Sequence, residues 1–169
     1  MKGTSKAVER MRKVYPEFDL FELEDDTREI FQRLYEAFLR RDLEYVEKVA
    51  EDQALGYFKA SIIRWEEMQV RPKVDKIWFL DAVELQDASI VQSFPVFTFM
   101  IRMQDIDCLI STKPEDEGKD VIISGGENNI TSSSYMISLM LHDNPDLESV
   151  GHIWRIVDFR LAETHKMLV

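Results

Sequence analysis

The chain has 169 residues, of which 45% are hydrophobic and 11% aromatic. This length favours one domain with its own core, and the single cysteine, Cys108, excludes an internal disulfide framework and a Cys-rich zinc site. The formal charge of −11, from 32 acidic and 21 basic residues, argues against bulk binding of nucleic acid. The most apolar run, residues 94–101, is far shorter than the ~18–20 residues that a membrane-spanning helix needs.

The charge is distributed unevenly along the chain. Residues 1–14 contain five bases and one acid, a net +4, which leaves −15 for the rest of the chain (−11 less +4). A basic segment ahead of an acidic body allows contact with an anionic surface at one end only. An ordinary solvated first helix explains the same charges equally well.

The first predicted element is an amphipathic helix over residues 4–15, in which Val8, Met11 and Tyr15 follow helical spacing. Pro16 is expected to end it, because proline disfavours helical backbone in the residue before it. The segment lacks the apolar centre of a secretory signal. Its basic, amphipathic character resembles an organellar presequence, and it is equally typical of the first helix of a mature domain.

Three further helices are predicted before the first strand. Asp19 is placed as the N-cap of a long helix over residues 19–41, whose apolar stripe recurs at spacings of three and four residues. Asp42 is expected to cap a short helix over residues 43–51. A fourth helix follows over residues 53–69.

After Pro72 the composition changes to the β-branched and aromatic residues typical of strands. Pro95 is expected at the start of a strand or at a bulge, because it cannot donate a ladder hydrogen bond. Residues 112–119 read as a charged turn. Four strands and one short additional strand are predicted, over residues 74–85, 90–103, 129–142 and 152–162, and over residues 121–124.

Helices followed by long antiparallel strands predict an α+β fold, with N-terminal helices packed on one face of a curved antiparallel sheet. No internal repeat or linker divides the chain. We expect a basic amphipathic head over residues 1–18 that is separable from an α+β domain over residues 19–169.

Few residues suggest metal binding or covalent catalysis. His142, His152 and His165 form no metal-binding motif, and the first two are expected to face solvent beside a turn. Cys108 has no neighbouring histidine and is interpreted as a strand residue. The Gly-rich residues 125–127 lack the ending of a phosphate loop. We therefore expect no metal and no cofactor.

Carboxylates on the predicted strands are the remaining candidates for chemistry. Asp105 and Asp107, two residues apart, would share one face of a strand and form an acidic pair. Acid–base catalysis in a cone-shaped pocket would need a carboxylate beside an aromatic hydroxyl. The candidates for that arrangement are Asp81 or Asp158 with Tyr57 or Tyr135. Ordinary strand placement is the favoured interpretation, so the chain is not expected to be an enzyme.

An apolar pocket has more support in the sequence than a catalytic site. If the helices close over a curved sheet, aromatic and methionine side chains would converge between the two layers, and an incompletely filled interior would hold an apolar ligand. The residues expected there are Tyr57, Trp65, Trp78, Phe97, Phe99, Met136 and Trp154. A filled core is the favoured alternative.

Three landmarks follow one another along the chain. The first is a short helix, a link at residues 16–19 (PEFD), a long helix and a turn at residues 41–44 (RDLE), and the other two are residues 94–99 (FPVFTF) and residues 154–158 (WRIVD). In this order they resemble the C-terminal domain of the mitochondrial inner-membrane translocase subunit Tim44, a family that has "GDLE" at the turn and "GPVLIITF" and "WRLLDI" at the two strands. The resemblance covers roughly residues 5–163 and implies a cone of the nuclear-transport-factor-two type.

The resemblance also implies a non-enzymatic, peripheral protein on the matrix side of the mitochondrial inner membrane. Family members anchor the import motor, with its chaperone, to the translocase, and their leading helices contact cardiolipin-rich membrane. In this chain the implied apolar contacts are Val8, Met11 and Tyr15, and the implied phosphate contacts are Lys6, Arg10, Arg12 and Lys13. The alternative is a structural accessory subunit of a mitochondrial assembly, such as the large subunit of the mitoribosome or an inner-membrane complex.

Overall fold

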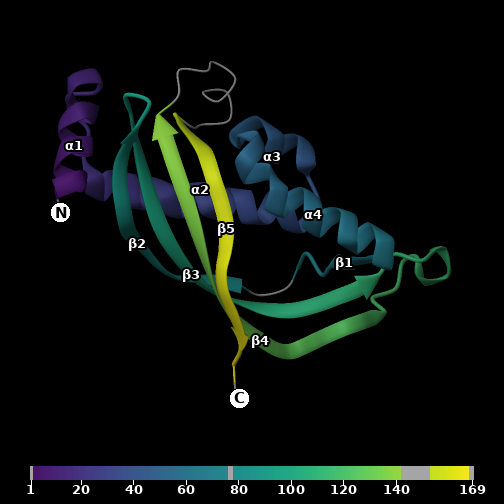
Figure 1. Ribbon diagram of the computed structural model, residues 1–169. Helices are drawn as coiled ribbons and strands as arrows, with labels where there is room; N and C mark the ends of the chain where they lie inside the picture. Colours follow the sequence, from purple (N-terminus) through teal and green to yellow (C-terminus); the bar gives the residue numbers. More distant parts are fainter. Residues whose placement is uncertain (1, 76–77, 142–152, 168–169) are drawn as a thin grey trace.

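The computed structural model describes residues 2–75, 78–141 and 153–167. In these residues, helices precede a sheet, which confirms the predicted α+β class (Figure 1). The helices are α1 (Lys2–Val14), α2 (Leu20–Leu39), α3 (Leu43–Val49), α4 (Asp52–Met68) and the short 3-10 helix η1 (Pro114–Asp116). The strands are β1 (Val70–Pro72), β2 (Trp78–Val91), β3 (Phe94–Ser111), β4 (Ile122–Leu141) and β5 (Trp154–Lys166).

Capping side chains set the beginnings of two helices. Asp19 accepts a hydrogen bond from the backbone N–H of Phe21 at 2.9 Å, and Asp42 accepts one from Tyr45 at 3.1 Å. These bonds satisfy backbone donors that have no partner within the first turn of a helix. Both caps agree with the sequence prediction, and α1 ends at Val14, one residue before the predicted end.

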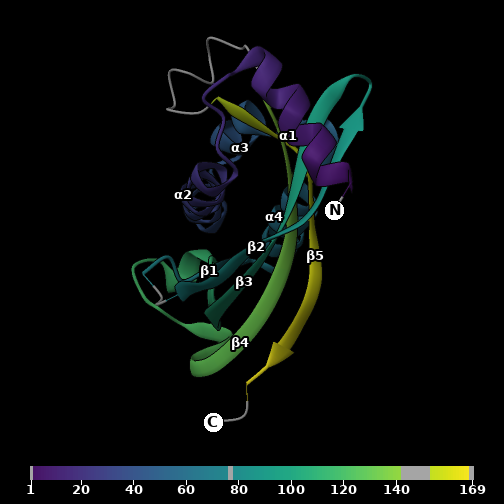
Figure 2. The same ribbon diagram turned by 90° about the vertical axis from the view of Figure 1, so that its left-hand side faces the viewer.

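β3 is the central strand of a strongly curved antiparallel sheet (Figure 1). The order is β1-β3-β4-β5, and β2 pairs with the first part of β3 while β1 pairs with its end. α2 lies across the concave face (Figure 2). The side chains of β3 that face α2, namely Phe97, Phe99, Ile101 and Met103, are at most 1% exposed. Pro95 is the second residue of β3, as expected for a strand start.

The sheet differs from the prediction at its hairpin and at its ends. β2 continues to Val91, and the chain reverses at Gln92 and Ser93, whose φ values are 50° and 73°. Two consecutive positive φ values are typical of a type I′ turn, which usually contains Asn or Gly. Gln92 and Ser93 are not residues that mark such a turn. The sequence prediction of a break between the two strands at residues 86–89 is therefore wrong. β1 is missed, and the short strand predicted at residues 121–124 is the beginning of β4.

α1 belongs to the same hydrophobic core as the other helices. Ala7 and Met11 are 0% and 1% exposed, and Phe18, which follows the helix, is 4% exposed. Gly3 lies so close to β2 that an added Cβ would be 2.8 Å from the carbonyl oxygen of Ala88. α1 therefore covers part of the edge of the sheet at β2 (Figure 2). The boundary expected at residue 18 does not separate two cores.

Gly125 lies where β4 changes its register against β3. The pairing shifts between Ile106 and Cys108, and Gly125, which is opposite Cys108, has a φ of +73°. A Cβ at this position would lie 2.0 Å from the carbonyl oxygen of Asp107. The irregular pairing therefore requires glycine, both for its backbone conformation and for the close approach.

Gly125→Ala should lower the free energy of unfolding by roughly 2 kcal/mol or more, because it combines an unfavourable φ with a backbone clash. Gly126→Ala is the matched control, since nothing lies within 4 Å of its Cβ position. Urea denaturation followed by circular dichroism gives both values. Equal stabilities of the two variants would contradict this account of the register shift.

Candidate functional site

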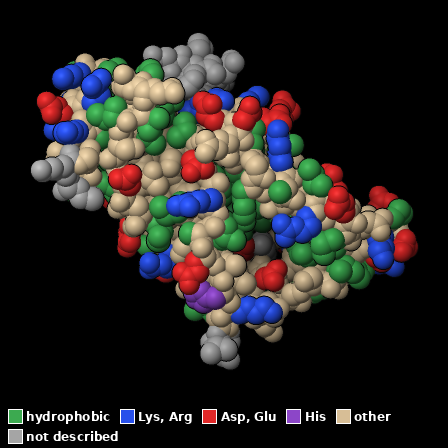
Figure 3. Space-filling view, viewed as in Figure 1, with side chains coloured by type: hydrophobic (Ala, Val, Ile, Leu, Met, Phe, Trp, Pro, Cys, Tyr) green, Lys and Arg blue, Asp and Glu red, His purple; other side chains and the backbone are tan. Residues whose placement is uncertain are grey.

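The basic face of α1 consists of Lys6, Arg10 and Lys13. Their spacing of four and three residues places them on one side of the helix, and all three are exposed. The other side, which contains Ala7 and Met11, is buried against the sheet. Figure 3 shows basic side chains gathered over α1, at the upper left of the view. The fold thus brings three of the four bases assigned to phosphate contacts together on one exposed surface.

Arg12, the fourth of these bases, has a different position. Its Nε donates a hydrogen bond to the carbonyl oxygen of Phe18 at 3.2 Å. This bond spans the short link between α1 and α2 and holds the chain as it turns from one helix into the other. Arg12 therefore stabilises the connection and is not part of the basic face.

The apolar residues assigned to lipid contacts lie in different environments. Met11 is 1% exposed and belongs to the core, which corrects its assignment to the membrane surface. Val8 is half-buried against the same core, whereas Tyr15 is 41% exposed. Apolar residues at helical spacing mark a core-facing side as readily as a lipid-facing one. In α1 the sheet occupies most of that side.

Two exposed apolar residues near α1 are absent from the sequence prediction. Val14 is 69% exposed and Phe21 is 79% exposed, and they flank the link between α1 and α2. Val14 directly follows Lys13 at the end of the basic face. The sequence could have indicated that Phe21 is exposed, because Phe21 does not belong to the buried apolar stripe of α2, which begins at Leu23. Apolar surface is therefore present beside the exposed bases.

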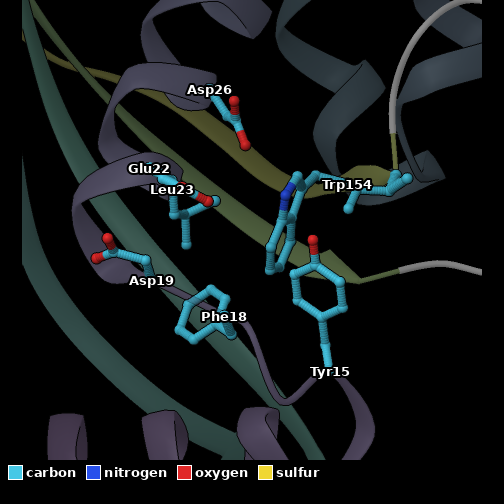
Figure 4. A pocket seen from close by; sticks show the side chains of 8 residues that line it. Tyr15, Phe18, Asp19, Glu22, Leu23, Asp26 and Trp154 are labelled. Carbon is cyan, nitrogen blue, oxygen red and sulfur yellow. The ribbon is translucent and has the colours of Figure 1, made fainter.

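A cleft between the α1–α2 link and β5 combines aromatic and acidic side chains (Figure 4). Tyr15, Phe18 and Trp154 contribute rings, and Glu22 and Asp26 contribute carboxyl groups. Partial burial, and after it three neighbouring carboxylates, raises the pKa of Asp26. Carboxylates repel anions, so the basic face of α1, and not this cleft, is suited to phosphate groups.

The seven residues expected around an apolar pocket are spread over several parts of the structure. Phe97 packs against Phe18 and Trp154, with ring centroids 5.3 Å and 6.2 Å apart. Phe99 is fully buried on the same face of β3. Met136 is half-buried and alternates with inward-facing residues along β4, so it belongs to the outer face of the sheet.

The other three aromatic residues pack against α2. Trp65 stacks on Phe38 with a centroid distance of 4.9 Å, and the Tyr57 ring lies 5.8 Å from the same ring. Trp78 makes an edge contact with Tyr35 at 4.9 Å. These contacts are those of a packed core between α2, α4 and the sheet.

A polar cluster lies within this aromatic interior. The hydroxyl of Tyr35 donates a hydrogen bond to the carboxylate of Asp105, which joins α2 to β3, and the rings of Tyr57 and Tyr135 make an edge contact with centroids 5.9 Å apart. Burial raises the pKa of both Tyr35 and Tyr135 well above the usual value of 10.0, and the Asp105 charge adds to the effect on Tyr35. Hydrogen bonding makes the burial of such groups tolerable, so the cluster ties helices to the sheet.

The carboxylates named as candidates for acid–base chemistry have different positions in the structure. Asp105 is buried and Asp107 is half-buried, and Asp107 lies where the pairing of β3 with β4 changes its register, so the two carboxylates have different surroundings. Asp81 is exposed, and Asp158 is half-buried. The carboxylate that meets an aromatic hydroxyl is Asp105, and its partner is Tyr35, 70 residues away in sequence. The pair is a core contact between two layers.

Within the described residues, no group of three or more His, Cys, Asp or Glu side chains is placed to hold a metal ion. His142 and His152 lie outside the described residues. Cys108 is 1% exposed, which suits a strand residue in the core. In the part of the chain that the structure describes, no helix has the length and apolar character to cross a membrane.

Helices packed on a curved, open antiparallel sheet, with a basic helix at one end, define an α+β domain of the nuclear-transport-factor-two-like cone type. The family model of the Tim44-like domain matches residues 4–160. The chain therefore belongs to the Tim44-like domain family, which confirms the resemblance found in the sequence. No curated protein shows a significant match to the chain. Family membership is consistent with a mitochondrial role associated with the protein-import translocase at the inner membrane.

Met11→Ala should lower the free energy of unfolding by about 2–4 kcal/mol, because it empties a buried position between α1 and the sheet. Val14→Ala, at a side chain that is 69% exposed, should change it by less than about 0.5 kcal/mol. Urea denaturation of both variants tests this difference. If Met11→Ala is as stable as Val14→Ala, α1 does not contribute to the core as described.

The free energy of unfolding should fall as the pH rises above about 10, because the unfolded state then releases phenolic protons that the folded state keeps on Tyr35 and Tyr135. Below the tyrosine pKa of the unfolded state, both states keep the phenolic proton and the stability is unchanged. As the pH rises from there towards the higher pKa of the folded state, the stability is lost. Each group adds a slope of up to about 1.4 kcal/mol per pH unit. Tyr35→Phe should therefore make the decline shallower.

Urea denaturation between about pH 8 and pH 11 measures this slope. Tyr35→Phe should also lower stability near neutral pH by about 1–3 kcal/mol, because the Asp105 carboxylate loses a hydrogen bond. Tyr15→Phe, at an exposed side chain, serves as the control and should change neither quantity. If the free energy of unfolding falls with pH equally steeply in Tyr35→Phe and in the unaltered chain, Tyr35 does not contribute to the decline.

Proposed function

We propose that this chain is a peripheral domain of the mitochondrial protein-import machinery, on the matrix side of the inner membrane, where it anchors the import motor to the translocase and to cardiolipin-containing membrane. The observation that carries the proposal is the basic face of α1, which is exposed beside Val14 and Tyr15 in a Tim44-like domain. Family membership supports the mitochondrial setting, and α1 supplies a surface with the chemistry for anionic lipid.

Three bases give an attraction that is useful but sensitive to salt. Each Lys or Arg near an anionic membrane surface contributes about 1 kcal/mol, and salt screens this attraction. Val14 and Tyr15 add shallow burial of apolar surface at the interface. The residues that follow the first 14 carry a net −15, which anionic lipid repels. The domain is therefore expected to approach the membrane with α1 foremost.

The proposed role is that of a non-enzymatic binding module. The Tyr35–Asp105 pair joins α2 to β3 in the interior, and the exposed chemistry of the first helix is that of an electrostatic contact. We propose translocase and chaperone proteins as the partners held by the rest of the domain surface. Anchoring of this kind requires a stable fold and two separate contact surfaces, one for lipid and one for protein.

Arg10→Glu combined with Lys13→Glu should reduce co-flotation of the full chain with cardiolipin-containing liposomes at least tenfold, because two attractions of about 1 kcal/mol each become repulsions. The melting temperature should remain nearly unchanged, since both side chains are exposed. The control is Arg102→Glu with Arg160→Glu, which makes the same change in charge at two exposed positions on the sheet. Deletion of residues 1–15 is unsuitable, because it also removes part of the core.

Flotation is compared at low and high salt, and with neutral liposomes. The unaltered chain and the control should float with cardiolipin at low salt and detach at high salt. Undiminished flotation of the Arg10 and Lys13 variant would show that the basic face of α1 is not the membrane contact. No flotation of the unaltered chain under any condition would contradict membrane attachment and favour a structural subunit held by protein contacts.

A further inference from the structure

The loop around η1 lies at the end of the molecule opposite α1 (Figure 1), and a second cluster of basic side chains lines a pocket there. Arg41 from the α2–α3 turn, Arg71 from β1, and Lys113 and Lys119 from the loop around η1 line one surface pocket. The pocket has a volume of about 400 Å³, which is within the range of small-molecule sites. The fold thus collects in one place four bases that lie far apart in the sequence.

The ion pairing of these four bases determines the charge of the pocket. Among the residues that the structure describes, no carboxylate forms an ion pair with any of them within 4.0 Å. Asp116 and Glu117 also line the pocket, so four positive charges face two negative ones there. The Asp116 carboxylate already accepts a hydrogen bond from the Ser111 hydroxyl at 2.6 Å. The pocket is therefore locally positive in a chain with a net charge of −11.

The two arginines are the groups best suited to hold a ligand in this pocket. Arg71 is half-buried on β1, and its Nη1 donates to the carbonyl oxygen of Pro72 at 3.4 Å. A guanidinium has five N–H donors, so this one long bond leaves Arg71 with donors for another group. Arg41 has a φ of 59°, a conformation that favours glycine, and the chain nevertheless places a long cationic side chain at this position.

We propose that this pocket binds the phosphate group of a small anionic ligand. A guanidinium offers phosphate paired N–H donors in a planar fork, and a lysine ammonium adds a compact charge. The open mouth and the exposure of three of the four bases predict binding that weakens as salt is added. The phosphate comes either from a free compound or from a lipid headgroup, and both present the same chemistry to the pocket. The proposal does not rest on the function proposed for α1.

The test is an NMR titration of the isotope-labelled full chain with sodium pyrophosphate at low ionic strength, with sodium chloride added to a reference sample to equal ionic strength. Saturable shifts are expected at the backbone amides of Arg71 and of residues 111–119. Arg71→Gln combined with Lys113→Gln should weaken binding at least tenfold, because it removes two of the four charges. The control, Arg102→Gln with Arg160→Gln, should leave the affinity unchanged.

A gain in affinity separates a binding defect from a folding defect. Glu117 is exposed at the pocket, so Glu117→Gln should leave the fold intact and tighten pyrophosphate binding about threefold by removing one repulsion. The proposal is overturned if neither pyrophosphate nor the short-chain lipid described below gives saturable shifts beyond those in the chloride reference. It is also overturned if the Arg71 and Lys113 variant and its control have equal affinity for the probe that saturates.

The two sources of phosphate are distinguished with a soluble short-chain phosphatidic acid. Similar saturable shifts with this lipid and with pyrophosphate show recognition of the phosphate itself, as in a free ligand. Saturation with the lipid alone assigns the pocket to a headgroup, and both results support the proposal. Failure of both probes refutes it, and does so independently of how the Arg10 and Lys13 variant behaves in flotation.

Discussion

The apolar stripe of α2 has to be covered, and the concave face of the sheet covers it. Phe31 and Leu34 of α2 are at most 1% exposed, as are the residues of β3 that face them, and each such side chain contributes about 1.5–3 kcal/mol through burial. The Tyr35–Asp105 hydrogen bond fixes the helix and the strand relative to each other inside this contact. α1 then closes the edge at β2 with its own apolar side, which directs its bases outward. The exposed site is thus a consequence of how the interior is filled.

The charged side chains divide the surface of this domain into basic regions, which attract anions, and acidic regions, which repel them. The loop around η1, which lines the pocket around Arg71, lies at the opposite end of the molecule from α1 (Figure 1), and most of the remaining charge is acidic. An acidic surface repels anions in general, so these two clusters of bases stand out, within the described residues, as places suited to an anion. The first is a helix side suited to an extended surface, and the second is a pocket suited to one small group. This difference in shape separates the two proposed ligands, a membrane surface and a small phosphate compound, which composition alone cannot distinguish.

Local patterns in the sequence predict the helices well, because a cap such as Asp19 and an apolar stripe lie within a few residues of each other. The β2–β3 hairpin is misplaced because Gln92 and Ser93 adopt positive φ values without the residues that usually mark such turns. The site is predicted in part. Spacing identifies the bases of α1, but it cannot tell whether Met11 faces lipid or protein, and the Tyr35–Asp105 pair depends on tertiary packing across 70 residues.

Met11 and Lys13 are two residues apart on α1, yet they face different surroundings. A helix that inserts into a bilayer turns its apolar side towards the acyl chains, but in α1 that side is already buried against the sheet. Rolling the helix towards lipid would uncover the edge of β2 beside Ala88. In the proposed membrane contact, α1 would therefore act as a rigid part of the domain. The direction in which the exposed bases of α1 point would then set the tilt of the whole domain against the bilayer plane.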